Sequence, residues 1–184
     1  MTRAAVQNRL RHYWKMEAAN VFFAPAIGTA VVIHDGDHVG LPMIFAMLAT
    51  ASLLVIGAFA LRAHYKMTKG EPDTMKAFVP VAARLQKPML LLCVAAMVGA
   101  GYALWRDKGF SPSGIATCVF ALLATLEYIN YYVVQLQHFD HAADFRRLIA
   151  GQGFRRSHLA RAIARYRIGG QDTPTAPLSP QTSP

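Results

Sequence analysis

Four long apolar runs alternate along the chain with segments that hold most of its charged residues. Each run approaches the ~20 residues that an α-helix needs to cross the ~30 Å hydrocarbon core of a bilayer. The runs predict membrane spans over residues 16–33, 41–61, 88–105 and 113–136. The predicted fold class is therefore all-α, an integral membrane four-helix bundle with amphipathic cytoplasmic helices at both ends.

The links between the runs predict how the spans pair. Residues 34–38 and 106–112 are short and rich in turn-forming residues, so each should join two spans into an antiparallel hairpin. Between the hairpins we expect a polar loop over residues 62–87. Pro25 is expected to kink the first span, and the small residues of the second and third spans favour close helix approach.

The segments outside the spans are basic. Residues 1–15 fit an amphipathic helix on the membrane surface, or equally a flank whose aromatic residues anchor the first span. The bundle itself is assigned to residues 16–136. Residues 137–168 are predicted to be a basic cytoplasmic helical extension, and residues 169–184 to be disordered because Gly, Pro, Ser and Thr dominate them.

Composition supports a membrane protein and gives its orientation. Hydrophobic residues make up 54% of the chain and charged residues 16%, against about 25% charged in soluble proteins. Of the 19 Lys and Arg residues, only Arg106 and Lys108 lie in the two short links. The positive-inside tendency then predicts that both termini lie in the cytoplasm. The expected partners are the bilayer and anionic lipid headgroups rather than nucleic acid.

Motifs for catalysis are sparse. The chain has no glycine-rich phosphate loop, no Cys-x-x-Cys pair and no zinc-protease pattern. No cofactor is therefore expected, and an enzyme is disfavoured. Cys93 and Cys118 are read as small core residues. The polar start of the chain does not resemble a cleavable signal sequence, and the first span is expected to be retained.

The last apolar run contains an unexpected polar stretch. At about 100° per residue, Glu127, Asn130, Tyr131, His138 and His141 share one helix face. If helix four continues into the cytoplasm, these side chains form a seam from the bilayer to the solvent. Glu127 would then lie roughly 12 Å inside the inner end of span four.

An ionised carboxylate facing lipid is costly, so Glu127 is expected to face the bundle interior. Its possible partners are Glu17, Asn20, the tyrosine hydroxyl groups or the same seam in another subunit. The seam can be interpreted as a hydrogen-bond network that fixes helix orientation and oligomer register, or as a path for protons or cations. The network is favoured because the runs contain no second clear intramembrane charge.

Two clusters offer weak metal-ligand chemistry. Their members are His34, Asp35, Asp37 and His38 in the first link, and His138, Asp140, His141 and Asp144 after span four. Both clusters also fit simpler interpretations, an exposed turn for the first and a solvated helix extension for the second. The simpler interpretations are favoured.

The stretch Glu127-Tyr128-Ile129-Asn130-Tyr131-Tyr132, followed by Gln135-Leu136-Gln137 and a later Leu159-Ala160-Arg161 segment, resembles the end of small, uncharacterised bacterial multi-pass membrane proteins. The resemblance covers about a quarter of the chain. It implies a bacterial inner-membrane setting and carries no activity with it.

These observations leave three hypotheses for function. The first is a non-catalytic structural, assembly or stress-response component, acting as a homo-oligomer or with a membrane protein partner. The second is a small ion channel or proton-coupled transporter that uses Glu127. The third is a membrane enzyme with a metal bound by the cluster from His138 to Asp144.

Overall fold

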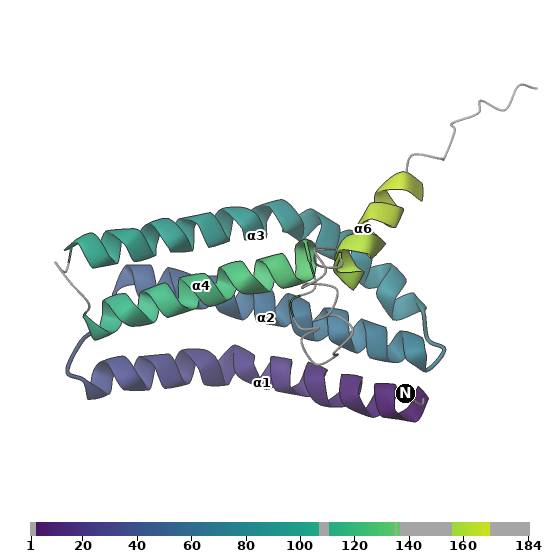
Figure 1. The fold of residues 1–184 in the computed structure, drawn as a ribbon, viewed down its shortest axis with the longest axis horizontal. Coiled ribbons are helices and arrows are strands. Elements are labelled where there is room, and N and C mark those ends of the chain that lie inside the picture. Colours follow the sequence, from purple (N-terminus) through teal and green to yellow (C-terminus); the bar gives the residue numbers. More distant parts are fainter. Residues whose placement is uncertain (1–2, 107–110, 135, 137–155, 170–184) are drawn as a thin grey trace, which may run out of the picture.

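The computed structural model describes residues 3–106, 111–134, 136 and 156–169. Within these ranges the protein is helical and forms no strand. The four long helices run side by side in an antiparallel bundle, and a shorter helix packs near the end of α4 (Figure 1). The helices are α1 (Arg3–His34), α2 (Leu41–Thr68), α3 (Asp73–Arg106), α4 (Pro112–Tyr132) and α6 (His158–Gly169).

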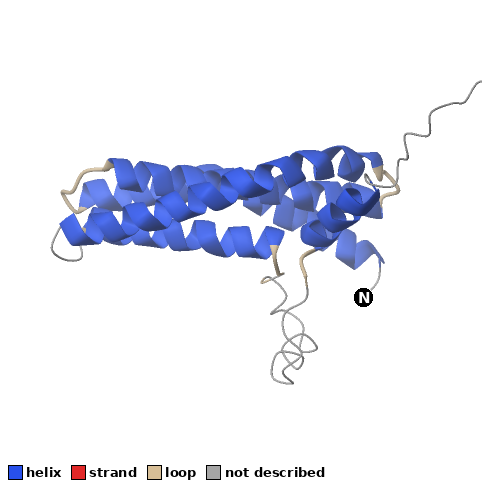
Figure 2. Ribbon diagram, turned by 90° about the horizontal axis from the view of Figure 1, so that it is seen from above, coloured by secondary structure: helices blue, strands red, loops and turns tan. Residues whose placement is uncertain are grey.

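The four long helices are each long and apolar enough to cross a membrane. A perpendicular view shows them aligned along one common direction (Figure 2). The predicted multi-pass helical bundle is therefore confirmed at the level of four spanning-length apolar helices.

Helix α2 is the centre of the bundle because it packs against α1, α3 and α4. Its small residues, including Ala46, Ala49 and Gly57, are buried, as expected for close helix approach. The hydroxyl of Thr50 donates to the carbonyl oxygen of Phe120 on α4 at 2.8 Å. The ring of Phe120 in turn packs directly on Gly28 of α1.

The prediction that residues 62–87 form a loop is wrong, because most of them are helical. Helix α2 continues to Thr68 and α3 begins at Asp73, which leaves only a short turn between them. Gly70 makes this turn with a φ of 93°, a conformation that side chains disfavour. The helices extend because their apolar positions stay paired beyond the predicted spans, as the buried Ala63 and Ala82 demonstrate.

Residues 3–15 are part of α1 and not a separate element. The side-chain amide of Gln7 donates to the carbonyl oxygen of Thr68 at 3.0 Å. The guanidinium of Arg62 lies 5.7 Å from the Trp14 ring centroid, within cation–π range. These contacts to α2 fit the helical flank, which is one of the two interpretations left open by the sequence.

The prediction that helix four continues past residue 132 is also wrong. The backbone N–H groups of Val133 and Val134 both donate to Ile129, at 3.0 and 2.8 Å, and Val134 pairs with Arg156 in an isolated antiparallel bridge. The side-chain oxygen of Asn130 accepts from the Leu136 N–H at 2.9 Å. Such a local bond gives the backbone an alternative to the next helical turn.

The bundle has two different ends. At the hairpin end, α1 leads into α2 and α3 ends near the start of α4; at the basic end lie the N-terminus, the α2–α3 turn and α6 (Figure 1). The basic end carries Arg9, Arg11, Lys15, Arg62, Lys66, Lys69, Lys76, Arg84, Lys87, Arg156, Arg161, Arg165 and Arg167. Among the described residues, Arg106 is the only Lys or Arg at the hairpin end.

Candidate functional site

A cluster of polar side chains lies inside the bundle near the end of α4. Its centre is Tyr131, whose hydroxyl donates a hydrogen bond to the carboxyl oxygen Oε1 of Glu17 on α1. Both side chains are buried, with 6% and 8% of their surface exposed. This bond joins α4 directly to α1, two helices that otherwise touch little.

Tyr131 reaches Glu17 by passing over Gly57 of α2. A Cβ atom at Gly57 would overlap the ring and the hydroxyl oxygen of Tyr131. A glycine inside a helix costs roughly 1 kcal/mol relative to alanine. Here the missing side chain is what makes room for the phenol between α1 and α4.

Glu127 and Asn130 complete the polar cluster, which we define as Glu17, Glu127, Asn130 and Tyr131. The Asn130 amide donates to the Oε2 atom of Glu127 at 3.5 Å, a long hydrogen bond. Glu127 also interacts with Tyr131 and, through space, with the carboxyl group of Glu17. Two carboxyl groups from different helices therefore meet around one phenol.

The structure thus brings together the predicted members Glu127, Asn130 and Tyr131, with Glu17 as their partner. Glu17 is thus a second acidic group inside the bundle, where the apolar runs had shown no second clear intramembrane charge. Asn20, the other predicted partner, is exposed and lies outside the cluster. His138 and His141 lie outside the described residues, and the helical geometry that aligned them with Glu127 ends at Tyr132.

The cluster lies close to one boundary of the predicted membrane core. Glu17 is about 17 residues from the hairpin end of α1, and Tyr131 about 19 residues from the start of α4. At 1.5 Å per residue these separations are about 26 and 28 Å, close to the ~30 Å of a hydrocarbon core. Because α4 ends at Tyr132, Glu127 is only about 8 Å from the helix end, less than the sequence predicted.

Ser157 fastens α6 to the same region. Its hydroxyl donates to the carbonyl oxygen of Tyr131, and its N–H donates to the carbonyl oxygen of Val133 at 3.2 Å. The same hydroxyl accepts from the Ala160 N–H at 2.9 Å and so caps α6. Sequence reasoning missed Ser157, although a serine directly before a helical run is a known capping signal.

Helix α6 packs against α3 and the end of α4 through the buried Leu159 and Ile163. The hydroxyl of Tyr132 donates to the carbonyl oxygen of Ala82 on α3 at 3.2 Å. This bond joins the end of α4 to α3 beside α6. On the α2 side, the rings of His158 and His64 have centroids 5.0 Å apart. The sequence predicted a basic helix in this region, but not where it docks.

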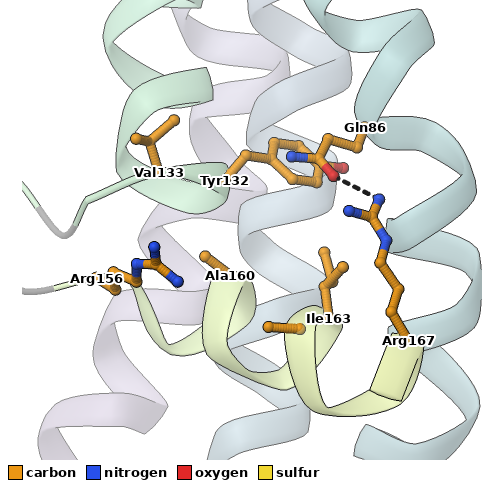
Figure 3. A pocket seen from close by; sticks show the side chains of 8 residues that line it. Gln86, Tyr132, Val133, Arg156, Ala160, Ile163 and Arg167 are labelled. Carbon is orange, nitrogen blue, oxygen red and sulfur yellow. Dashed lines mark hydrogen bonds between the residues drawn. The ribbon is translucent and has the colours of Figure 1, made fainter. Parts of the chain in front are cut away.

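A pocket of about 260 Å³ lies between α6, α3 and the end of α4 (Figure 3). Arg156 and Arg167 stand on opposite sides of it, and the Arg167 guanidinium donates to the Gln86 side-chain oxygen at 2.9 Å. The lining residues are Gln86, Tyr132, Val133, Arg156, Ala160, Ile163, Ala164 and Arg167.

One candidate metal ligand of the first link, Asp37, has another role. Asp37 accepts from the backbone N–H of Ser113 at 3.0 Å and from that of His38 at 2.8 Å. The carboxylate therefore satisfies a free N–H at the start of α4. Within the described ranges no three His, Cys, Asp or Glu residues are arranged to hold a metal. His138, Asp140, His141 and Asp144 lie outside those ranges.

Comparisons of the chain with protein-family models, with curated proteins and with solved structures gave no match. Any functional argument therefore rests on the geometry of this chain.

Proposed function

We propose that the protein is a non-catalytic multi-pass component of a bacterial inner membrane that supports the assembly of a membrane complex. The observation that carries this proposal is the bond from Tyr131 to Glu17 across the bundle. It pairs a polar side chain of the last span with one of the first span inside a single chain. Such an arrangement suits a device that fixes helix positions.

The energetics support a packing role. A buried polar group without a partner costs free energy, and a complete network avoids that cost while specifying which helices meet. Interhelical hydrogen bonds in membranes contribute about 1 kcal/mol. Helix α1 packs mainly against α2, and this bond adds a direct link from α1 to α4, with which α1 shares few other contacts.

The proposed task of the bundle is to hold a basic surface at the membrane. Ser157 anchors α6 to the end of α4, while Arg161 and Arg165 on α6 are exposed. Basic residues near a membrane surface attract anionic lipid and acidic protein segments. The strong asymmetry of Lys and Arg between the two ends favours a cytoplasmic position for the basic end, and hence for both termini.

Flux measurements on purified protein in liposomes test this proposal, with a pH gradient or a voltage applied. We expect no proton or ion flux from the wild-type protein. We also expect Glu127→Gln to elute from a sizing column as the wild type does, since the amide keeps the shape of the acid. A flux that Glu127→Gln abolishes would overturn the structural proposal.

A small proton-coupled transporter is the second candidate, and the meeting of Glu17 and Glu127 at Tyr131 favours it. Two carboxyl groups in one site repel when both are ionised, so such a pair can hold a shared proton. Intramembrane acids often mark proton relays. In this case both Glu17→Gln and Glu127→Gln should abolish flux, whereas Glu71→Gln, at the exposed α2–α3 turn, should leave it unchanged.

A further inference from the structure

The pocket between α6, α3 and the end of α4 carries concentrated positive charge. Arg156 and Arg167 both line it, and no acidic residue does. Among the described acidic residues, none forms an ion pair with either guanidinium. Two arginines that line one small pocket, with no acid beside them in the part of the chain that the structure describes, favour an anion there.

The shape of arginine narrows the choice of anion. A guanidinium presents its N–H donors in a planar fork that matches two oxygens of a phosphate group. The bond from Arg167 to Gln86 holds one guanidinium at the edge of the pocket (Figure 3). Arg156 lines the pocket on the opposite side from Arg167 (Figure 3), so the pocket offers guanidinium donors on two sides.

The remaining walls are apolar. Val133, Ala160, Ile163 and Ala164 contribute only hydrocarbon, and the Tyr132 hydroxyl is already bonded to Ala82. A site for inorganic phosphate alone would be expected to offer further donors on these sides. Part of the pocket wall is cationic and part is apolar, which suits a ligand that is itself amphiphilic.

The depth of the pocket matches the headgroups of a lipid leaflet. Tyr132 lies about 20 residues from the start of α4, and Gln86 lies about 20 residues from the hairpin end of α3. Both separations correspond to about 30 Å along a helix, the thickness of a hydrocarbon core. If the hairpin end lies at one membrane boundary, the pocket opens at the other.

We propose that this pocket binds the phosphate group of an anionic phospholipid from the leaflet at the basic end. Arg156 and Arg167 hold the phosphate oxygens, and the apolar wall of α6 and Val133 receives the adjoining glycerol and the first acyl carbons. The inference rests on the proposed membrane position of the bundle and adds a defined lipid partner to it. A lipid bound in this pocket would stabilise the packing of α6 against α3 and the end of α4.

Lipid binding to the full-length protein in a mild detergent tests this inference, with phosphatidylglycerol as the probe and native mass spectrometry as the readout. Phosphatidylcholine and inorganic phosphate are the comparison ligands. We expect phosphatidylglycerol to be retained preferentially, and the double variant Arg156→Gln, Arg167→Gln to weaken its binding about tenfold. The matched control is Arg161→Gln, Arg165→Gln, which removes the same charge from exposed positions of α6 outside the pocket.

Equal losses in the two double variants would overturn the site and indicate diffuse attraction to a basic surface. Retention of inorganic phosphate as strong as that of the lipid would overturn the lipid assignment in favour of a free anion. Equal retention of phosphatidylcholine would overturn the requirement for net negative charge. A third variant, Ala164→Leu, fills the pocket without changing charge and should weaken lipid binding too, so the inference stays testable if the arginine variants fold poorly.

The flux assay on the same preparation separates this inference from the proposed function. Loss of the lipid site with no flux would reject the pocket and leave the structural role intact. A flux that depends on Glu127 with normal lipid binding would reject the structural role and leave the pocket in place.

Discussion

The two ends of the bundle are built in different ways. At the hairpin end, short links and backbone caps such as Asp37 on the start of α4 join the helices. At the basic end, α4 stops at Tyr132 while α1, α2 and α3 continue, and α6 packs where α4 ends (Figure 1). There the helices are joined by side chains, among them Tyr131 with Glu17 and Ser157 with the Tyr131 backbone.

This difference indicates where function resides. The hairpin end needs only turn chemistry and apolar packing. The basic end contains one buried and one partly buried carboxyl group, a glycine that makes room for a phenol, and a pocket with two arginines. Matched substitutions at the two ends can therefore distinguish the effect of ordinary helix packing from that of the polar cluster and the pocket.

The largest effect is expected for Gly57→Ala. Its Cβ atom would collide with Tyr131, so α2 and α4 must separate or the phenol must leave Glu17. Overpacking of this kind costs about 1–3 kcal/mol. Thermal unfolding in detergent, followed by circular dichroism, should show a clearly lower midpoint.

The control for this change is Gly101→Ala on α3, where no atom lies within 4 Å of the added Cβ. Alanine there should leave stability unchanged or raise it by up to about 1 kcal/mol, because it is the better helix former. Similar destabilisation at both positions would contradict the role given to Gly57.

Tyr131→Phe should have the next largest effect. It deletes the hydroxyl that bonds Glu17 and leaves a buried carboxyl without its donor, at a cost of about 1–2 kcal/mol. The matched change Tyr132→Phe removes an equally buried hydroxyl whose acceptor is a neutral carbonyl oxygen. It should cost less, and the unfolding midpoints of the two variants give the comparison directly.

Much of this architecture could be predicted from sequence, because apolar length and turn residues are local signals. They predicted the four spanning helices and the short link after His34. The lengths of α2 and α3 were underestimated because their charged ends remain helical through tertiary contacts such as Gln7 with Thr68. Propensity and hydropathy do not encode such contacts.

The polar cluster was predicted in part. Helical periodicity placed Asn130 and Tyr131 with Glu127, and Glu17 was among the candidate partners. The choice between Glu17 and Asn20 depends on how α1 is rotated against α4. The room for Tyr131 depends on Gly57, 74 positions away in the chain. The end of α4 was missed because it depends on side-chain bonds from Asn130 and Ser157 to the backbone.

A smaller and local effect is expected for Ser157→Ala. It removes the cap of α6 and its link to Tyr131, at a cost of about 1 kcal/mol concentrated in α6. Hydrogen exchange should accelerate over residues 158–169 while α2 stays protected. Ser111→Ala removes the corresponding cap of α4 at the hairpin end, and it should leave exchange in α6 unchanged. Faster exchange in α6 for both variants would contradict a local anchor.

The smallest effect is expected for Asp37→Ala, which leaves the Ser113 N–H at the start of α4 without its carboxylate acceptor. A partly buried cap of this kind contributes about 0.5–1 kcal/mol. The control Asp35→Ala alters an exposed neighbour whose side chain makes no hydrogen bond to the residues that the structure describes, and it should not change the unfolding midpoint. Adding zinc distinguishes capping from metal binding, because a metal bound by this link would raise the wild-type midpoint. We expect zinc to have no effect; a rise that Asp37→Ala abolishes would replace the cap with a metal site and give the hairpin end a chemistry of its own.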